Sequence, residues 1–146
     1  MDISLLTCRA MSRVGTSSTT ERHFSDFLVN GTSLLSLLVK SGGGHSDFMS
    51  CFVDGYQKQQ KMALKKLMLK EKPDTDRGGV LLYVCPECGD IGCGAYSVLV
   101  KKNDAGYVWE SFAYENGYEE PQPIENVGPF LFSAEAYATA LSQAAA

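Results

Sequence analysis

VLLYVCPECGDIGCGAYSVLV, residues 80–100, is the stretch that decides the fold. Residues 80–85 are almost continuously apolar, which is typical of a central strand covered on both faces. The segment from Cys85 to Cys93 holds three cysteines, a proline and two glycines, a composition that favours a tight turn. Residues 95–100 form a second apolar segment. The sequence therefore predicts an antiparallel β-hairpin whose turn is the cysteine-rich segment.

Working outward from this hairpin, the remaining patterns predict further strands and helices around it. The helical patterns fall mostly before residue 78 and the strand patterns mostly after it, an order that indicates an α+β fold. We expect one domain over residues 1–146, an antiparallel β-meander of three to five strands with packed helices. Residues 1–22 form either an extra strand and loop or a less ordered segment. The predicted strands cover residues 3–11, 24–29, 80–85, 95–100, 107–114 and 130–132, and the predicted helices cover residues 34–38, 56–72 and 134–143.

Composition places the chain among ordinary globular proteins. It has 146 residues, of which 45% are hydrophobic and 21% are charged, so disorder is not expected. There is no apolar run near the ~20 residues that a membrane-spanning helix needs, and the N-terminus lacks the pattern of a signal peptide. Five cysteines, three of them within nine residues, indicate free thiols rather than a disulfide framework. We expect a cytoplasmic protein with no membrane partner.

Charge divides the chain into two unequal parts. The net charge is −4, and residues 86–146 carry two lysines against nine acidic residues. An acidic half of this kind repels the phosphates of nucleic acids and attracts basic proteins. The lysine-rich helix predicted over residues 56–72 is more typical of an amphipathic helix with a solvated face than of a phosphate-binding surface. We therefore expect a basic protein partner and no direct contact with nucleic acid.

The cysteine-rich turn allows three interpretations. Cys85, Cys88 and Cys93 resemble part of a zinc knuckle, but a closed tetrahedral site needs four ligands. The simpler interpretation is a stiff turn with small thiols packed beneath it. A redox pair is disfavoured because the context is strand-turn-strand. No cofactor is required, and zinc is the one candidate. A fourth zinc ligand would come from elsewhere in the sequence: Cys8, His23, His45 or Cys51.

The segment SGGGHSD, residues 41–47, is the closest approach to a catalytic pattern. His45 beside Asp47 could act as a general base, yet the spacing of a phosphate-binding loop and of a nucleophile elbow is missing. A solvated loop is the simpler interpretation. Because no set of nucleophile, base and orienting residue can be assembled, we do not expect an enzyme.

The segment WESFAYENGYEE, residues 109–120, combines aromatic residues with carboxylates. Strand alternation predicts Trp109, Ser111 and Ala113 on one face and Glu110, Phe112 and Tyr114 on the other. Aromatic anchors beside negative charge are typical of a surface that binds a basic protein, although an ordinary solvated strand and loop fits as well. The predicted partner-binding residues are Asp90, Trp109, Glu110, Tyr114, Glu115, Tyr118, Glu119 and Glu120.

Residues 81–84, the CPECGDIGCG turn, the VWESF strand at 108–112 and the GPFLF segment at 128–132 resemble a family of small uncharacterised bacterial proteins. That family has a strand, a CPxCGDxGCG turn, a VxWxxF strand and a PFxF segment followed by a helix. Residues 30–35 are similar to its N-terminal part. Small acidic bacterial proteins without catalytic signatures are often immunity proteins of toxin systems, including contact-dependent growth inhibition.

The resemblance implies a fold more than an activity, and the association with small acidic bacterial proteins leads us to expect a non-enzymatic immunity protein or antitoxin. Such a protein would neutralise a cognate basic toxin of the nuclease type by covering its active site or substrate groove. The alternative function is a small zinc-binding or redox protein centred on the turn from Cys85 to Cys93.

Overall fold

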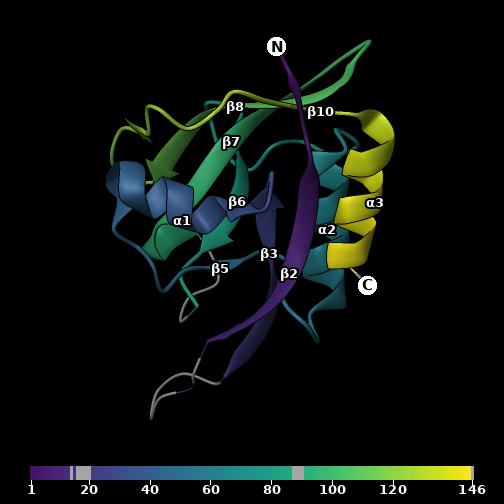
Figure 1. Ribbon diagram of the computed structural model, residues 1–146. Coiled ribbons are helices and arrows are strands. Elements are labelled where there is room, and N and C mark those ends of the chain that lie inside the picture. The colour runs from purple at the N-terminus through teal and green to yellow at the C-terminus, as the bar shows by residue number, and fades with distance from the viewer. Residues whose placement is uncertain (14, 16–20, 87–90, 146) are drawn as a thin grey trace.

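Two β-sheets and three α-helices make up the described part of the computed structural model, which covers residues 1–13, 15, 21–86 and 91–145 (Figure 1). The larger, curled sheet has the strand order β1-β10-β8-β7-β6-β5, with β9 also paired to β8. Its strands are β1 (Ile3–Ser4), β5 (Met49–Ser50), β6 (Val80–Val84), β7 (Ala95–Asn103), β8 (Gly106–Glu115), β9 (Gln122–Pro123) and β10 (Phe130–Phe132).

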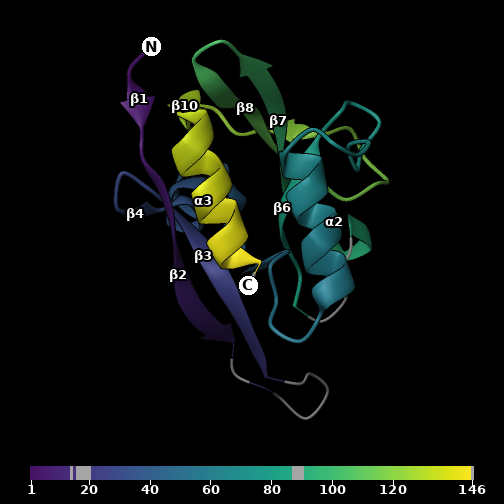
Figure 2. The ribbon, with the colours of Figure 1, turned by 90° about the vertical axis from the view of Figure 1, so that its right-hand side faces the viewer.

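The smaller sheet is antiparallel and comes from the N-terminal part of the chain. It has the order β2-β3-β4. Its strands are β2 (Leu6–Arg13), β3 (Arg22–Val29) and β4 (Thr32–Ser33). The helices are α1 (Leu34–Leu38), its π-helical continuation η1 (Val39–Gly43), α2 (Gln57–Leu67), the short 3₁₀ turn η2 (Ile91–Cys93) and α3 (Ala134–Ala144). The β2–β3 hairpin lies beside α3, and its lower end projects beyond the helices in Figure 2.

The predicted hairpin is present as the β6–β7 pair. Val80 lies opposite Val98 and Val84 opposite Ala95, and β8 continues the antiparallel meander. The turn enters β7 at Gly94, whose φ of +98° suits glycine; an added Cβ would lie 2.8 Å from Cε1 of Tyr114. Residues 87–90, the centre of the turn, lie outside the described residues.

The mixture of helices and strands is as predicted, but the larger sheet exceeds the three to five antiparallel strands expected. It has seven strands, and β1 runs parallel to β10, with Ile3 opposite Leu131. The predicted strand at residues 3–11 is interrupted after Ser4, so that its start is β1 of this sheet and its remainder belongs to β2 of the other. The unpredicted members β5 and β9 are, like β1, two residues long. Such strands are too short to carry a period-2 pattern, because the alternation needs about four residues to be recognised.

A β-bulge in β8 overturns the predicted alternation of its side chains. Ser111 has a φ of +54°, and the register shifts between the Ser97–Ala113 and Leu99–Glu110 pairs. A bulge adds one residue to one strand and so exchanges the faces beyond it. As a result, Trp109 and Phe112, predicted on opposite faces, both belong to the main core cluster.

Serine caps begin two of the helices. The Ser33 hydroxyl accepts a hydrogen bond from the Ser36 amide at the start of α1, and the Ser133 hydroxyl accepts one from the Ala136 amide at the start of α3. These bonds satisfy amide groups that lack a partner in the first helical turn.

Helix α2 ends at Leu67, five residues before the predicted end at Lys72. The Leu69 amide donates to the Lys66 carbonyl over 3.1 Å and the Lys70 amide donates to the Lys65 carbonyl over 2.8 Å, which is the Schellman pattern of helix termination. Leu69 itself has a φ of +60°. A leucine at this position does not predict a helix end, because the position is normally taken by glycine.

We expect the Leu69→Gly substitution to raise the free energy of unfolding by about 0.5–1 kcal/mol, because it relieves the left-handed conformation of a leucine that is 45% exposed. Urea denaturation monitored by circular dichroism measures the change. Met62→Gly, inside the same helix and 41% exposed, is the control, and it should instead destabilise by about 1 kcal/mol. A loss of stability in Leu69→Gly would contradict the prediction.

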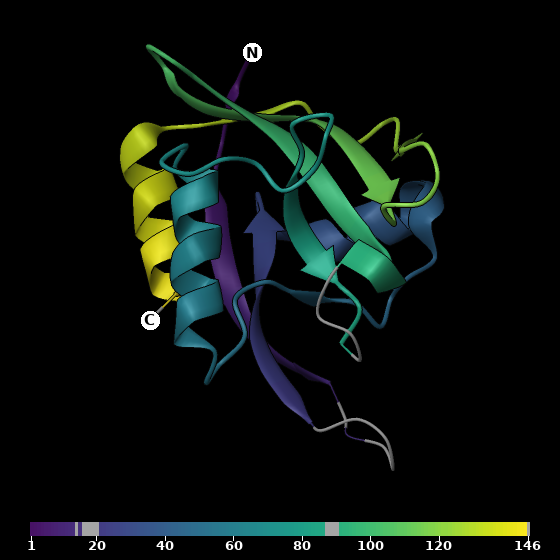
Figure 3. The same cartoon turned by 180° about the vertical axis from the view of Figure 1, so that it is seen from behind.

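The main core lies between the sheets and the paired helices α2 and α3, which run alongside each other in Figures 2 and 3. Trp109 is fully buried, and its indole Nε1 donates to the Tyr137 hydroxyl over 3.0 Å. That hydroxyl donates in turn to the Leu67 carbonyl over 2.6 Å. This chain of hydrogen bonds joins β8, α3 and α2. Within the described residues no helix has both the length and the apolar character needed to cross a membrane.

Candidate functional site

The predicted partner-binding residues that the structure describes divide into buried, partly exposed and exposed members. Trp109 is fully buried and Glu115 is 6% exposed, so neither is available to a partner in this structure. Tyr118 is 83% exposed, and Glu119 and Glu120 are exposed beside it. Asp90 lies outside the described residues. The exposed members of the predicted set therefore lie within residues 116–120, called the acidic loop below.

Glu115 is directed inward because it takes part in a buried polar cluster. Its Oε2 accepts from Arg77 Nε over 2.9 Å and from the Ser97 hydroxyl, and Arg77 Nη2 donates to Ser97 Oγ over 2.7 Å. A buried carboxylate is tolerated when it is paired and hydrogen-bonded in this way. Glu115 therefore joins the loop before β6 to the sheet.

The acidic loop is held in place at both ends. The Asn116 Oδ1 accepts hydrogen bonds from the amides of Tyr118 and Glu119, over 2.9 and 3.0 Å. After the loop, β9 pairs with β8, and the amide of the buried Ile124 donates to the Phe112 carbonyl over 2.8 Å. Tyr118 is thus displayed on an ordered turn between two anchored segments.

Two further predicted residues, Glu110 and Tyr114, are partly exposed. Glu110 forms an ion pair with Lys101, with Nζ and Oε1 3.2 Å apart. The Tyr114 ring stacks on the His45 imidazole with centroids 4.7 Å apart, and the other face of that imidazole stacks on Phe48, also at 4.7 Å. His45 is therefore half-buried among aromatic rings rather than a solvated loop residue. The two rings stacked on it come from β8 and from the residue just before β5.

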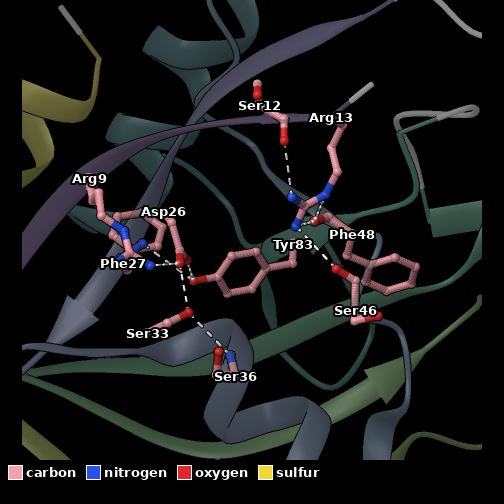
Figure 4. Close-up of polar contacts among 10 residues, drawn as sticks. All are labelled: Arg9, Ser12, Arg13, Asp26, Phe27, Ser33, Ser36, Ser46, Phe48 and Tyr83. Atoms are coloured by element: carbon pink, nitrogen blue, oxygen red, sulfur yellow. Dashed lines mark hydrogen bonds and ion pairs between the residues drawn. The ribbon is translucent and has the colours of Figure 1, made fainter. Parts of the chain in front are cut away.

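A buried carboxylate that the sequence analysis missed lies at Asp26 in β3 (Figure 4). Asp26 is 2% exposed and accepts from the Tyr83 hydroxyl over 2.6 Å and the Ser33 hydroxyl over 2.7 Å. The Arg9 guanidinium lies 4.0 Å away and is largely exposed. Burial, and then the charge of Asp26, raise the pKa of Tyr83 well above its usual value, so this hydroxyl stays protonated and donates.

Arg13 links the β2–β3 hairpin to the segment before β5. Its Nη2 donates to the carbonyls of Ser46 and Phe48, over 3.1 and 2.8 Å (Figure 4). Its Cζ also lies 4.9 Å from the centroid of the Phe24 ring. These bonds satisfy carbonyls of the segment that carries His45, so Arg13 has a structural role here.

The cysteines do not form a recognisable metal site in the part of the chain that is described. Cys8, Cys51 and Cys85 are free, Cys93 is disulfide-bonded, and Cys88 is outside the described residues. The expectation of free thiols is therefore wrong for Cys93. Among the described residues no three His, Cys, Asp or Glu side chains are grouped so as to hold a metal ion. A sulfur in a disulfide is not a thiolate ligand, so zinc at this turn would require reduction of that bond.

Cys51, one of the candidate fourth ligands, is a protonated thiol in this environment. Burial, and then the nearby Asp74 carboxylate, raise its pKa to about 12. The thiolate is the form that attacks electrophiles and binds metals. Cys51 is accordingly a packing residue at neutral pH.

Comparison with protein-family models, with curated proteins and with solved structures finds no match for this chain. The resemblance to the CPxCGDxGCG family is therefore still a prediction.

Proposed function

We propose that this chain is a non-enzymatic binding protein of the immunity-protein or antitoxin type, and that the acidic loop contacts a basic toxin. The toxin would be neutralised by having its active site or substrate groove covered. The observation that supports this most directly is Tyr118, which is 83% exposed between an anchored Asn116 turn and two exposed carboxylates.

The acidic loop combines features that raise the association rate of a protein complex with features that lengthen its lifetime. Exposed carboxylates steer a basic partner toward the surface, which raises the association rate. Tyrosine is enriched among residues that dominate binding energy, because its ring buries a large apolar area at a small entropic cost. The Asn116 hydrogen bonds and the β8–β9 pairing hold the loop before the partner arrives, which lowers the cost of ordering it.

Charge reversal of the loop tests the proposal. We expect the Glu119→Lys/Glu120→Lys variant to lose, by about tenfold or more, its affinity for a basic protein that the wild-type chain captures from its source cells. Mass spectrometry identifies the captured protein, and a binding titration with the purified pair measures the affinity. Expression of that protein alone should be toxic, and co-expression of the wild-type chain should suppress the toxicity.

Glu71→Lys/Asp104→Lys is the matched control, because both residues are exposed and away from the acidic loop, and it should bind like the wild type. The proposal fails if the loop variant binds and protects as well as this control. Near-stoichiometric zinc in protein purified with reductant and without added metal would instead favour the zinc-binding alternative.

A further inference from the structure

We propose that the groove between α2 and the β5–β6 edge of the larger sheet binds a small amphipathic ligand. Such a ligand has an apolar body and a single carboxylate, as a medium-chain fatty acid does. The groove encloses a cavity of about 360 Å³, within the range of known ligand pockets. It is separate from the acidic loop: α2 and the end of β8 that leads into the loop lie on opposite sides in Figure 3.

The walls of the groove suit the apolar body of such a ligand. Tyr56 and Met62 line the groove and are each 41% exposed. A bound ligand would therefore remove the apolar surface of these two side chains from water. Methionine side chains are flexible and adapt to ligands of different shape. The apolar side chains that line the cavity include Met49, Val53, Met62, Ala63, Leu81 and Val84.

Arg22 supplies the cation that a carboxylate needs. Its Nη1 donates to the Tyr56 hydroxyl over 2.6 Å, and its Cζ lies 5.3 Å from the centroid of the Tyr56 ring. Tyr56 therefore fixes the guanidinium at the groove and leaves other N–H donors of its fork for a ligand. Within the described ranges, no carboxylate of the protein forms an ion pair with Arg22.

The other charges in the groove cancel. Lys66 forms an ion pair with Asp74, whose Oδ2 also accepts from the Leu81 amide over 2.9 Å. The Cys51 thiol at the same cavity is neutral, for the reason given above. The described lining therefore carries one uncompensated positive charge, in a chain whose net charge is −4. A single carboxylate complements it, because partly desolvated charges favour a partner of opposite sign.

Titration of the full-length chain with sodium decanoate, followed by NMR and calorimetry, tests the proposal. We expect saturable binding at one site, with shifts at Met62 and Ala63. Arg22→Gln should weaken decanoate binding about tenfold, since hydrogen bonds to a charged group are lost, and should leave the weaker binding of decan-1-ol unchanged. Lys58 is an exposed lysine of α2 that does not line the groove. Lys58→Gln removes an equal charge and should leave decanoate binding unchanged.

Met62→Glu provides a second variant at an exposed position, which places a negative charge at the groove without disturbing the core; it should abolish decanoate binding. The proposal is overturned if the wild-type chain shows no saturable binding. It is also overturned if folded Arg22→Gln binds decanoate like the wild type, or if only a peptide, and not decanoate, occupies the groove. The loop variant Glu119→Lys/Glu120→Lys should retain decanoate binding, so this proposal and the proposed function can fail independently.

Discussion

Replacement of Trp109 by alanine is expected to lower the free energy of unfolding by about 3–5 kcal/mol. The indole is fully buried and makes edge-to-face contacts with Phe27 and Phe132, with centroids 5.6 and 5.1 Å apart. Its Nε1–H bond to Tyr137 is lost with it. A loss of this size is a large share of the stability of a domain of this length. Chemical denaturation followed by far-UV circular dichroism measures it.

Tyr118→Ala is the natural control for this substitution, because it removes another large aromatic ring from the same segment of sequence. Tyr118 is 83% exposed, so its replacement should change stability by no more than about 0.5 kcal/mol. Under the proposed function, Tyr118→Ala should weaken partner binding, whereas Trp109→Ala should act through folding. Equal stability of the two variants would show that Trp109 is not a core residue.

This pair of residues also shows how far the sequence could predict the site. Aromatic and acidic composition selected residues 109–120, of which Tyr118, Glu119 and Glu120 are exposed. Composition cannot separate exposed from buried members, however, because that depends on the register of β8. The bulge at Ser111 changes this register through one backbone angle. A serine at that position does not predict a bulge.

In the fold as well, the elements with local sequence signals could be predicted, and the pairings between distant segments could not. The β6–β7 hairpin and the capped helices α1 and α3 were predictable because their signals lie within one segment: continuous apolar runs, turn residues, and serine before an apolar helix. The parallel pairing of β1 with β10 joins Ile3 to Leu131. Both segments were predicted as strands, within residues 3–11 and 130–132, but nothing local to either one indicates that they pair across the chain, so only the folded structure reveals that pairing.

The amphipathic groove was missed for a related reason. Its lining comes from β3, β5, α2, β6 and the loops beside them, and each contribution is an ordinary residue in its own segment. Arg22 read alone is a surface arginine, and Met62 is one apolar residue of an amphipathic helix. Asp26 did leave a signal, since an acidic residue between Phe24 and Phe27 is unusual in a buried strand.

Tyr83→Phe is expected to lower the free energy of unfolding by about 1–3 kcal/mol, although it removes a single oxygen atom. The Tyr83 hydroxyl donates to Asp26 over 2.6 Å in a fully buried position, and its loss leaves the carboxylate with an unmet hydrogen-bonding requirement. Arg9 does not compensate, because its guanidinium lies 4.0 Å away and is 54% exposed. Urea denaturation at neutral pH measures the change.

Tyr96→Phe is the matched control for Tyr83→Phe. Tyr96 is equally buried as a residue, but the one hydrogen bond of its hydroxyl to the described residues is a 3.4 Å bond accepted from the His45 amide. Its loss should therefore cost less than about 1 kcal/mol. The cost of Tyr83→Phe should also shrink in an Asp26→Asn background, since the charge that needs the hydroxyl is then absent. Additive effects of Tyr83→Phe and Asp26→Asn would contradict the assignment of Asp26 as a carboxylate held by Tyr83.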